Sequence, residues 1–146
     1  MSTDYSEDRL IQKSAAELME TELGWTSIYA YDKEVLGENG TFGRNSFHEV
    51  LLTQRFRLAL KKLNPWINDK QIAEAIERMT ERMSSQTLMQ INEQKYQFIR
   101  DGIPVTRIKP DGTSEEIKAV VIDFENIDNN DFLCVRELWI YGALYR

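Results

Sequence analysis

The chain has 146 residues, of which 42% are hydrophobic and 29% are charged, values typical of one soluble domain with one core. A net charge of -6 argues against general binding to polyanions, because non-specific affinity for nucleic acid needs a surplus of Lys and Arg. The single cysteine, Cys134, excludes a disulfide framework and a thiolate metal cluster. An acidic N-terminus and the lack of a long apolar run predict a cytoplasmic protein that is neither exported nor embedded in a membrane.

Helical spacing dominates the chain as far as Gly102. A first helix is predicted to begin near Ser6 and to end at Gly24. Its expected inward residues are Leu10, Ile11, Leu18 and Met19. Residues 26–45 contain three glycines and are predicted to form a loop that can include short strands.

Three more helices are expected in residues 46–102. Ser46 followed by Glu49 matches a capping box, so the second helix should start there, and Pro65 should end it at the preceding residue. Asn68 is predicted to cap the third helix, and Gly102 to end the fourth. The expected inward residues of these two helices are Ile72, Ile76, Met79, Met83, Leu88, Ile91, Phe98 and Ile99.

Strand spacing follows, with three candidates at residues 103–109, 116–124 and 132–141. The tight turn at 110–112 favours antiparallel pairing, and residues 126–131 form a polar connector. The predicted fold class is therefore α+β, with a mainly helical part (1–102) before an antiparallel β meander (103–146). Because the chain stops within an apolar, strand-like region, we expect it to be truncated and to leave an exposed sheet edge at residues 138–145.

The first hairpin contains the residue types of a metal-dependent nuclease. Asp111 and Glu116 could bind a hard divalent cation through oxygen, and Lys118 could position the attacking water. Their spacing is unsuitable, however, because only four residues separate Asp111 from Glu116. Asp111 also lies at the tip of a turn, where water would surround any bound metal. We interpret these residues as a turn and the solvated side of a strand, so no metal site is assigned.

The other acidic and basic candidates also have structural interpretations. Asp123 and Glu125 could suit a metal or acid–base chemistry, but backbone donors of the following turn are the favoured partners of such an acid. His48 is expected at the surface. The second helix and the residues before it carry a basic group: Arg44, Arg55, Arg57, Lys61 and Lys62. These residues could form a DNA-binding strip that faces phosphates, or they could simply be the solvated face of a helix.

Three stretches occur in order along nearly the whole chain: residues 6–25, which end in Leu-Gly-Trp, residues 46–65, which end in Leu-Asn-Pro, and residues 121–135. The last stretch reads Val-Ile-Asp-Phe-Glu-Asn and then, from residue 129, Asn-Asn-Asp-Phe-Leu-Cys-Val. Together they resemble the N-terminal region of the restriction (R, or HsdR) subunit of type I restriction-modification enzymes.

The resemblance implies the first part of a single RecB-like nuclease domain of the Asp/Glu-x-Lys superfamily. The parent subunit would cleave double-stranded DNA during ATP-dependent translocation, using Mg²⁺ and ATP. The family's metal-binding Asp and its Glu-x-Lys motif would lie beyond Arg146, so the chain alone is expected to be inactive and to bind neither cofactor. Glu7, with Asp8 beside it, best resembles the accessory acid of related nucleases. The alternative is a module that docks onto the methyltransferase and specificity subunits.

Overall fold

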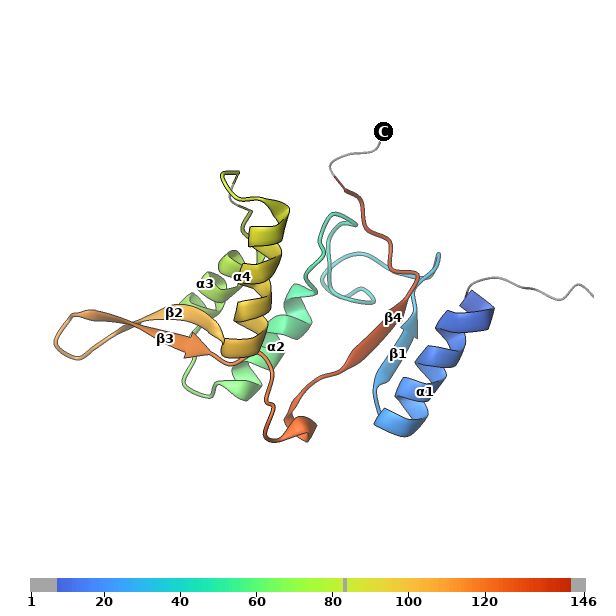
Figure 1. Ribbon diagram of the computed structural model, residues 1–146, viewed down its shortest axis with the longest axis horizontal. Helices are drawn as coiled ribbons and strands as arrows, with labels where there is room; N and C mark the ends of the chain where they lie inside the picture. Colours follow the sequence, from blue (N-terminus) through green and yellow to red (C-terminus); the bar gives the residue numbers. More distant parts are fainter. Residues whose placement is uncertain (1–7, 83, 143–146) are drawn as a thin grey trace, which may run out of the picture. The chain divides into compact units, whose positions relative to one another are not determined.

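The computed structural model describes residues 8–82 and 84–142, and the chain divides into two compact units. The first unit combines Met1–Leu52 with Asp131–Arg146, and the second unit is Thr53–Asn130. Each unit contains one two-stranded sheet (Figure 1). Helices and strands together confirm the predicted α+β class.

The sheet of the first unit joins strands from opposite ends of the chain. β1 (Thr26–Tyr29) pairs in parallel with β4 (Leu133–Arg136) over four aligned residue pairs. Trp25 and Phe132, the residues before the two strands, stack with ring centroids 4.9 Å apart. α1 (Lys13–Leu23) runs beside both strands and packs against them (Figure 1). This parallel pair is therefore packed against a helix on the α1 side.

A π-helical segment, Asp8–Gln12, leads into α1, and the helix ends at Gly24 as predicted. Gly24 has a φ of 68°, a left-handed conformation that glycine adopts without steric cost. Three of the four predicted inward residues are wrong; Met19 is half-buried, and Ala16 is the buried residue of α1. A small side chain lets the helix backbone approach the sheet, whereas three larger ones are exposed: Leu10, Ile11 and Leu18.

The predicted start of the second helix is also wrong, since α2 is Thr53–Leu63. The Ser46 hydroxyl accepts a hydrogen bond from the His48 N–H (3.3 Å), and the Glu49 carboxylate accepts one from the Asn45 N–H (3.0 Å). These side chains therefore stabilise a turn within the irregular loop that follows β1. The capping-box pattern identified a local hydrogen-bonding unit, but not a helix.

The second unit consists of three helices followed by a hairpin. α2 ends before Asn64-Pro65, as predicted. α3 (Asp69–Thr80) and α4 (Leu88–Asp101) each begin with a capping box, at Asn68 and at Thr87. The cap at Asn68 and the end of the fourth helix at Gly102 are confirmed.

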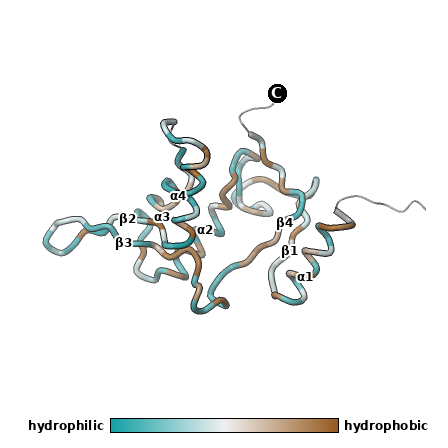
Figure 2. Tube along the Cα trace, in the orientation of Figure 1, coloured by the Kyte–Doolittle hydropathy of each residue, from teal (hydrophilic) through white to brown (hydrophobic). Residues whose placement is uncertain are grey.

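The hairpin pairs β2 (Ile103–Ile108) with β3 (Ser114–Ala119) in antiparallel register. Gly112 turns the chain with a φ of 85°, and its N–H donates to the Lys109 carbonyl (3.0 Å). The turn is largely hydrophilic (Figure 2). The predicted tight turn is therefore confirmed, although β3 begins and ends earlier than residues 116–124.

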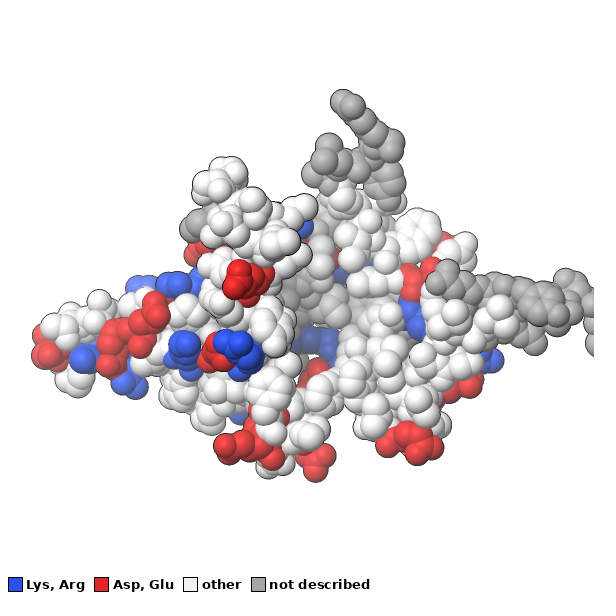
Figure 3. Space-filling view, viewed as in Figure 1, with Lys and Arg blue, Asp and Glu red and all other residues white. Residues whose placement is uncertain are grey.

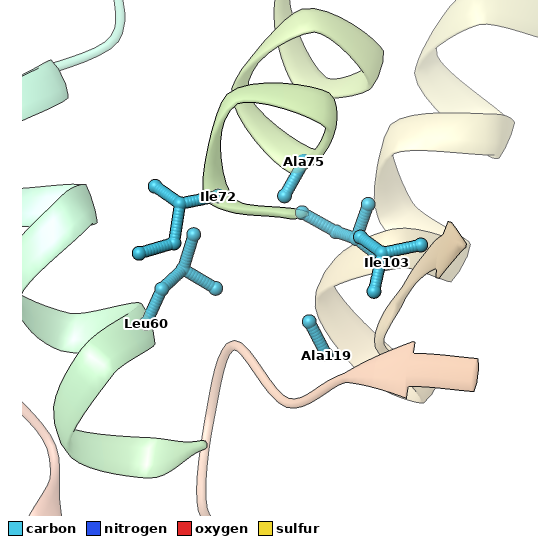
Figure 4. Close-up of a cluster of buried hydrophobic side chains, with 6 residues drawn as sticks. Leu60, Ile72, Ala75, Ile103 and Ala119 are labelled. Atoms are coloured by element: carbon cyan, nitrogen blue, oxygen red, sulfur yellow. The ribbon is translucent and has the colours of Figure 1, made fainter. Parts of the chain in front are cut away.

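The core of the second unit lies where α2 and α3 meet the hairpin. Figure 4 shows Leu60 of α2 and two residues of α3 facing Ile103 of β2 and Ala119 of β3. Each is at most 1% exposed. Of the predicted inward residues, Ile72 is buried, and Ile76, Met79 and Phe98 pack against this core. Leu88 is 77% exposed, so its prediction is wrong, and Met83 lies outside the described residues.

The predicted three-stranded meander is wrong as well. β4 does not join the hairpin, because it pairs in parallel with β1 in the first unit. The strand is also short: Glu137, with a φ of 56°, leaves the extended conformation directly after Arg136. The expected edge at residues 138–145 is not formed by residues 138–142, which contain no strand, and the rest of it lies outside the described residues. An apolar run predicts burial but not its partner.

Within residues 8–82 and 84–142, no helix has the length and apolar character needed to cross a bilayer.

Candidate functional site

α2 is the most basic helix among the described residues. Its four basic residues are accompanied by no acidic residue, whereas α1, α3 and α4 all contain acids. At helical spacing, Arg55 and Lys62 lie on one flank of the exposed surface and Arg57 and Lys61 on the other. Leu58, which is 68% exposed, lies between these flanks. The helix therefore presents two short rows of positive charge.

The four basic side chains of α2 differ in their surroundings. Lys61 and Lys62 are exposed, and Arg55 and Arg57 are half-buried. Lys61 lies 3.1 Å from the Asp69 carboxylate, but both side chains are largely exposed, so this ion pair is weak. Lys61 and Lys62 also lie in the last turn, where positive charge favours the helix. A solvated helix face and a phosphate-binding face are both consistent with this arrangement.

The structure does not place Arg44 in the predicted basic strip. Arg44 is 1% exposed and belongs to the first unit. Its Nε and Nη2 groups donate to the two carboxylate oxygens of Glu34, each at 2.5 Å. The same guanidinium donates to the backbone carbonyls of Glu49 (2.9 Å) and Trp139 (2.7 Å). Arg44 thus fastens residues of the long loop to the C-terminal segment.

The nuclease-like residues of the hairpin lie in a turn and on the exposed side of β3. Asp111 accepts hydrogen bonds from the Thr113 N–H (2.9 Å) and hydroxyl (2.6 Å), and the side-chain bond lowers the pKa of Asp111 below its usual value. Glu116 and Lys118 are exposed on β3. In the described part of the chain, no three His, Cys, Asp or Glu side chains form a metal-binding group. The turn interpretation of Asp111 is confirmed.

The hairpin also neutralises much of its own charge. Arg107 and Lys109 both pair with Glu115. Positive and negative side chains are accordingly interleaved over β2 and β3 (Figure 3). This surface gives no continuous positive field for a polyanion.

Asp123 organises the connector that precedes β4. Its Oδ1 accepts from the N–H groups of Glu125 (3.0 Å) and Asn126 (2.9 Å), and its Oδ2 accepts from the Asn129 side chain (2.9 Å). The bond from Asn129, followed by the two backbone bonds, lowers the pKa of Asp123. The predicted role as a turn acceptor is therefore confirmed, and the bonds involve both carboxylate oxygens.

Glu7 and His48 are the two remaining candidates. Glu7, the predicted accessory acid, lies outside the described residues. His48 is exposed, as predicted, and its Nδ1 lies 3.0 Å from the Tyr141 carbonyl oxygen. That contact belongs to a loop, not to a catalytic triad.

A feature that the sequence analysis missed is a small pocket in the first unit. Its volume is about 200 Å³, and its lining comes from the loop after β1 and from the segment after β4. The lining residues are Ala30, Asp32, Glu34, Phe47 and Trp139. These positions are distant in the sequence and share no motif, so no sequence signal could have grouped them.

The chain belongs to the family described as type I restriction enzyme R protein N terminus (HSDR_N), whose model matches residues 4–144. The resemblance noted in the sequence is thereby confirmed. No solved structure matches the chain.

The curated relatives are much longer than this chain. The chain is 29% identical over 119 residues to the type I restriction enzyme HindI endonuclease subunit of Haemophilus influenzae, a match that covers 81% of the chain and 11% of that protein. It is 24% identical over 132 residues to a Methanocaldococcus jannaschii protein named for the endonuclease subunit of the type I restriction enzyme MjaIXP. This second match covers 90% of the chain and 12% of the relative.

Proposed function

We propose that this chain forms the first part of the RecB-like nuclease domain of a type I restriction R subunit. The parent enzyme would cleave double-stranded DNA during ATP-dependent translocation, with Mg²⁺ and ATP as cofactors. The family match over residues 4–144 and the names of the two relatives support this proposal. Within the parent enzyme, the chain contributes phosphate contacts through α2.

The single observation that carries the phosphate-binding role is the unbalanced charge of α2. Each Lys or Arg that neutralises a phosphate releases condensed counterions, which makes binding favourable and sensitive to salt. The second unit has twelve acidic and twelve basic residues, so an acid-free helix is a local concentration of positive charge. Leu58 between the two basic flanks would lie over the sugar–phosphate surface without contributing charge.

Fluorescence anisotropy with a short labelled DNA duplex tests this role. The double variant Arg57→Ala/Lys62→Ala should bind more weakly, and the slope of log K against log salt should fall by about 0.9 for each phosphate contact that is lost. Lys109→Ala is the matched control, because Lys109 lies on the charge-balanced hairpin and pairs with Glu115. Equal affinity and equal slope for the double variant and the unchanged chain would contradict the phosphate-binding role of α2.

We also propose that the isolated 146-residue chain neither cleaves DNA nor binds ATP. The carboxylate of Asp111 is engaged by Thr113, and Glu116 and Lys118 lie exposed on β3. A plasmid-nicking assay with magnesium measures cleavage directly. Robust cleavage that disappears when all three residues are replaced by Ala would overturn this proposal.

A second candidate function is docking onto the methyltransferase and specificity subunits. The observation that favours it is the acidity of the first unit, which has twelve acidic and six basic residues and so accounts for the whole net charge of the chain. Acidic side chains gather at one end of α1 (Figure 3). A pull-down against the methyltransferase–specificity complex without DNA separates the two functions. Capture supports docking, and DNA binding without capture supports the role of α2 alone.

A further inference from the structure

A continuous row of aromatic rings crosses the first unit beside the small pocket. Each ring centroid in the row lies 6.2 Å from the next, in the order Tyr29, Tyr31, Trp139 and Phe47. Tyr141 extends the row at 5.4 Å from Phe47. Tyr31 and Trp139 are 46% and 40% exposed, respectively. The row therefore offers aromatic surface to solvent, and two of its members, Trp139 and Phe47, line the pocket.

The charges around this pocket leave one carboxylate unbalanced. Glu34, whose side chain is 4% exposed, is neutralised by the buried Arg44. Asp32 is exposed, and its carboxylate makes no hydrogen bond or ion pair with any other described residue. Both acids line the pocket. Its lining and Arg44 together therefore carry one net negative charge, located on Asp32.

The aromatic row already binds cations at two of its members. Arg136 lies over the Tyr29 ring at 4.6 Å, and Arg44 lies over the Phe47 ring at 5.3 Å. Among the described residues, no cation lies over the Trp139 ring, although indole is the strongest cation–π acceptor of the three aromatic side chains. The pocket is thus lined by an indole that has no cation over it and by an unpaired carboxylate.

The charge of the first unit determines which class of partner fits. Aromatic rows can also stack the bases of single-stranded nucleic acid, but such sites need positive charge to hold the phosphates. Here the surrounding unit carries a net charge of -6. A positively charged group is therefore favoured and a nucleic acid strand is disfavoured.

We propose that this pocket binds one alkylguanidinium group, the side chain of an arginine presented by another polypeptide. A planar guanidinium can stack on the Trp139 indole while its N–H donors reach the Asp32 carboxylate. A volume of about 200 Å³ accommodates one such group and not a folded element. The site lies in the first unit and does not depend on the proposed role of α2.

A titration monitored by two-dimensional NMR tests the proposal with three amides as probes. Nα-acetyl-arginine amide should shift the signals of Asp32, Phe47 and the Trp139 indole N–H. Nα-acetyl-citrulline amide has the same shape without the charge, so it should bind about fivefold more weakly or not at all, given the usual strength of exposed ion pairs and cation–π contacts. Nα-acetyl-lysine amide should lie between them, because an ammonium cannot stack.

Asp32→Asn is the decisive variant. Asp32 has a φ of 50°, a left-handed conformation that Asn also tolerates, so the loop should stay folded. The variant should lose the preference for arginine over citrulline, whereas Asp128→Asn, at an exposed acid of the second unit, should keep it. Three outcomes would overturn the proposal. The first is a Trp139 shift with arginine that Asp32→Asn leaves unchanged, and the second is equal binding of arginine and citrulline by the unchanged chain. The third is a shift of the same signals with a thymidine oligonucleotide.

Discussion

Replacing Arg44 by Met is expected to lower the free energy of unfolding of the first unit by about 3–5 kcal/mol. Arg44 and Glu34 form a buried ion pair whose side chains are 0% and 4% exposed. Methionine keeps much of the side-chain volume but leaves the Glu34 carboxylate buried without its partner. The free-energy cost of burying this carboxylate alone is larger than the stability that the intact ion pair contributed.

Two further contacts place the expected loss toward the upper part of that range. The Arg44 guanidinium also donates to the backbone carbonyls of Glu49 and Trp139. Both acceptors lose a charge-assisted donor in the variant, and each such bond is typically worth about 1.5–3 kcal/mol. Because a domain is stable by only about 5–15 kcal/mol, the variant should unfold at a markedly lower urea concentration.

Urea unfolding followed by tryptophan fluorescence measures this effect. Trp25 and Trp139 belong to the first unit, whereas Trp66 belongs to the second unit and is 45% exposed. A Trp66→Phe background therefore makes the fluorescence report on the first unit. The slope of stability against urea should stay unchanged, so that the shift of the midpoint reports stability alone.

A double-mutant cycle distinguishes the ion pair from general damage to the loop. The variant Arg44→Met/Glu34→Gln removes both charges and should be about 1–3 kcal/mol more stable than the sum of the single effects predicts. Lys13→Ala breaks an exposed pair with Glu17, 3.8 Å apart, and should cost less than about 0.5 kcal/mol. If Arg44→Met lowers the free energy of unfolding by less than about 0.5 kcal/mol, the cost expected for an exposed pair, the reasoning is refuted. Single effects that add without any coupling would refute it as well.

Three more predictions concern the second unit. Asn64→Ala should cost about 2–4 kcal/mol in urea unfolding, because the buried amide is hydrogen-bonded to both the N–H (2.7 Å) and the carbonyl (2.9 Å) of Val120. A loss below 1 kcal/mol would contradict this role. Gly102→Ala should lower the free energy of unfolding by about 1–3 kcal/mol, because φ is 94° and a Cβ would lie 2.9 Å from a carbonyl oxygen of β3. An unchanged melting temperature would argue against this strain. The hydrogen bond from Asn129 lowers the pKa of Asp123, so the ionised carboxylate stabilises the fold above its unfolded pKa of about 3.9. That contribution should be lost as the pH falls through the lower folded pKa, and Asp123→Asn should flatten this dependence; an NMR titration that gives Asp123 a pKa at or above the unfolded value would contradict it.

Local signals in the sequence predicted the helix ends well. Gly24, Asn68 and Gly102 mark boundaries as expected, because capping depends on hydrogen bonds between residues a few positions apart. The same locality explains the failure at Ser46, whose hydroxyl makes a short-range bond in a turn instead of a helix cap. A local pattern therefore locates a hydrogen-bonding unit more reliably than it predicts the length of the element.

Local signals could not predict which distant segments pair with each other. The apolar residues of β4 predicted a buried strand, but its parallel partner β1 lies at the other end of the chain. In the same way, α1 had several apolar residues to bury, and the sheet contacts the face with Ala16 instead. Which surfaces meet depends on shape and on competing contacts throughout the chain, which periodicity does not record.

The sequence by itself determined the family, the α+β class, most helix ends, and the interpretation of Asp111 and Asp123 as turn acceptors. Those conclusions rest on the order of motifs and on short-range hydrogen bonds. The tertiary structure alone decided that Arg44 is a buried anchor and that Asp32 and Trp139 line one pocket. Burial and the meeting of distant side chains are properties of the folded chain, because they arise only when separate segments exclude water together.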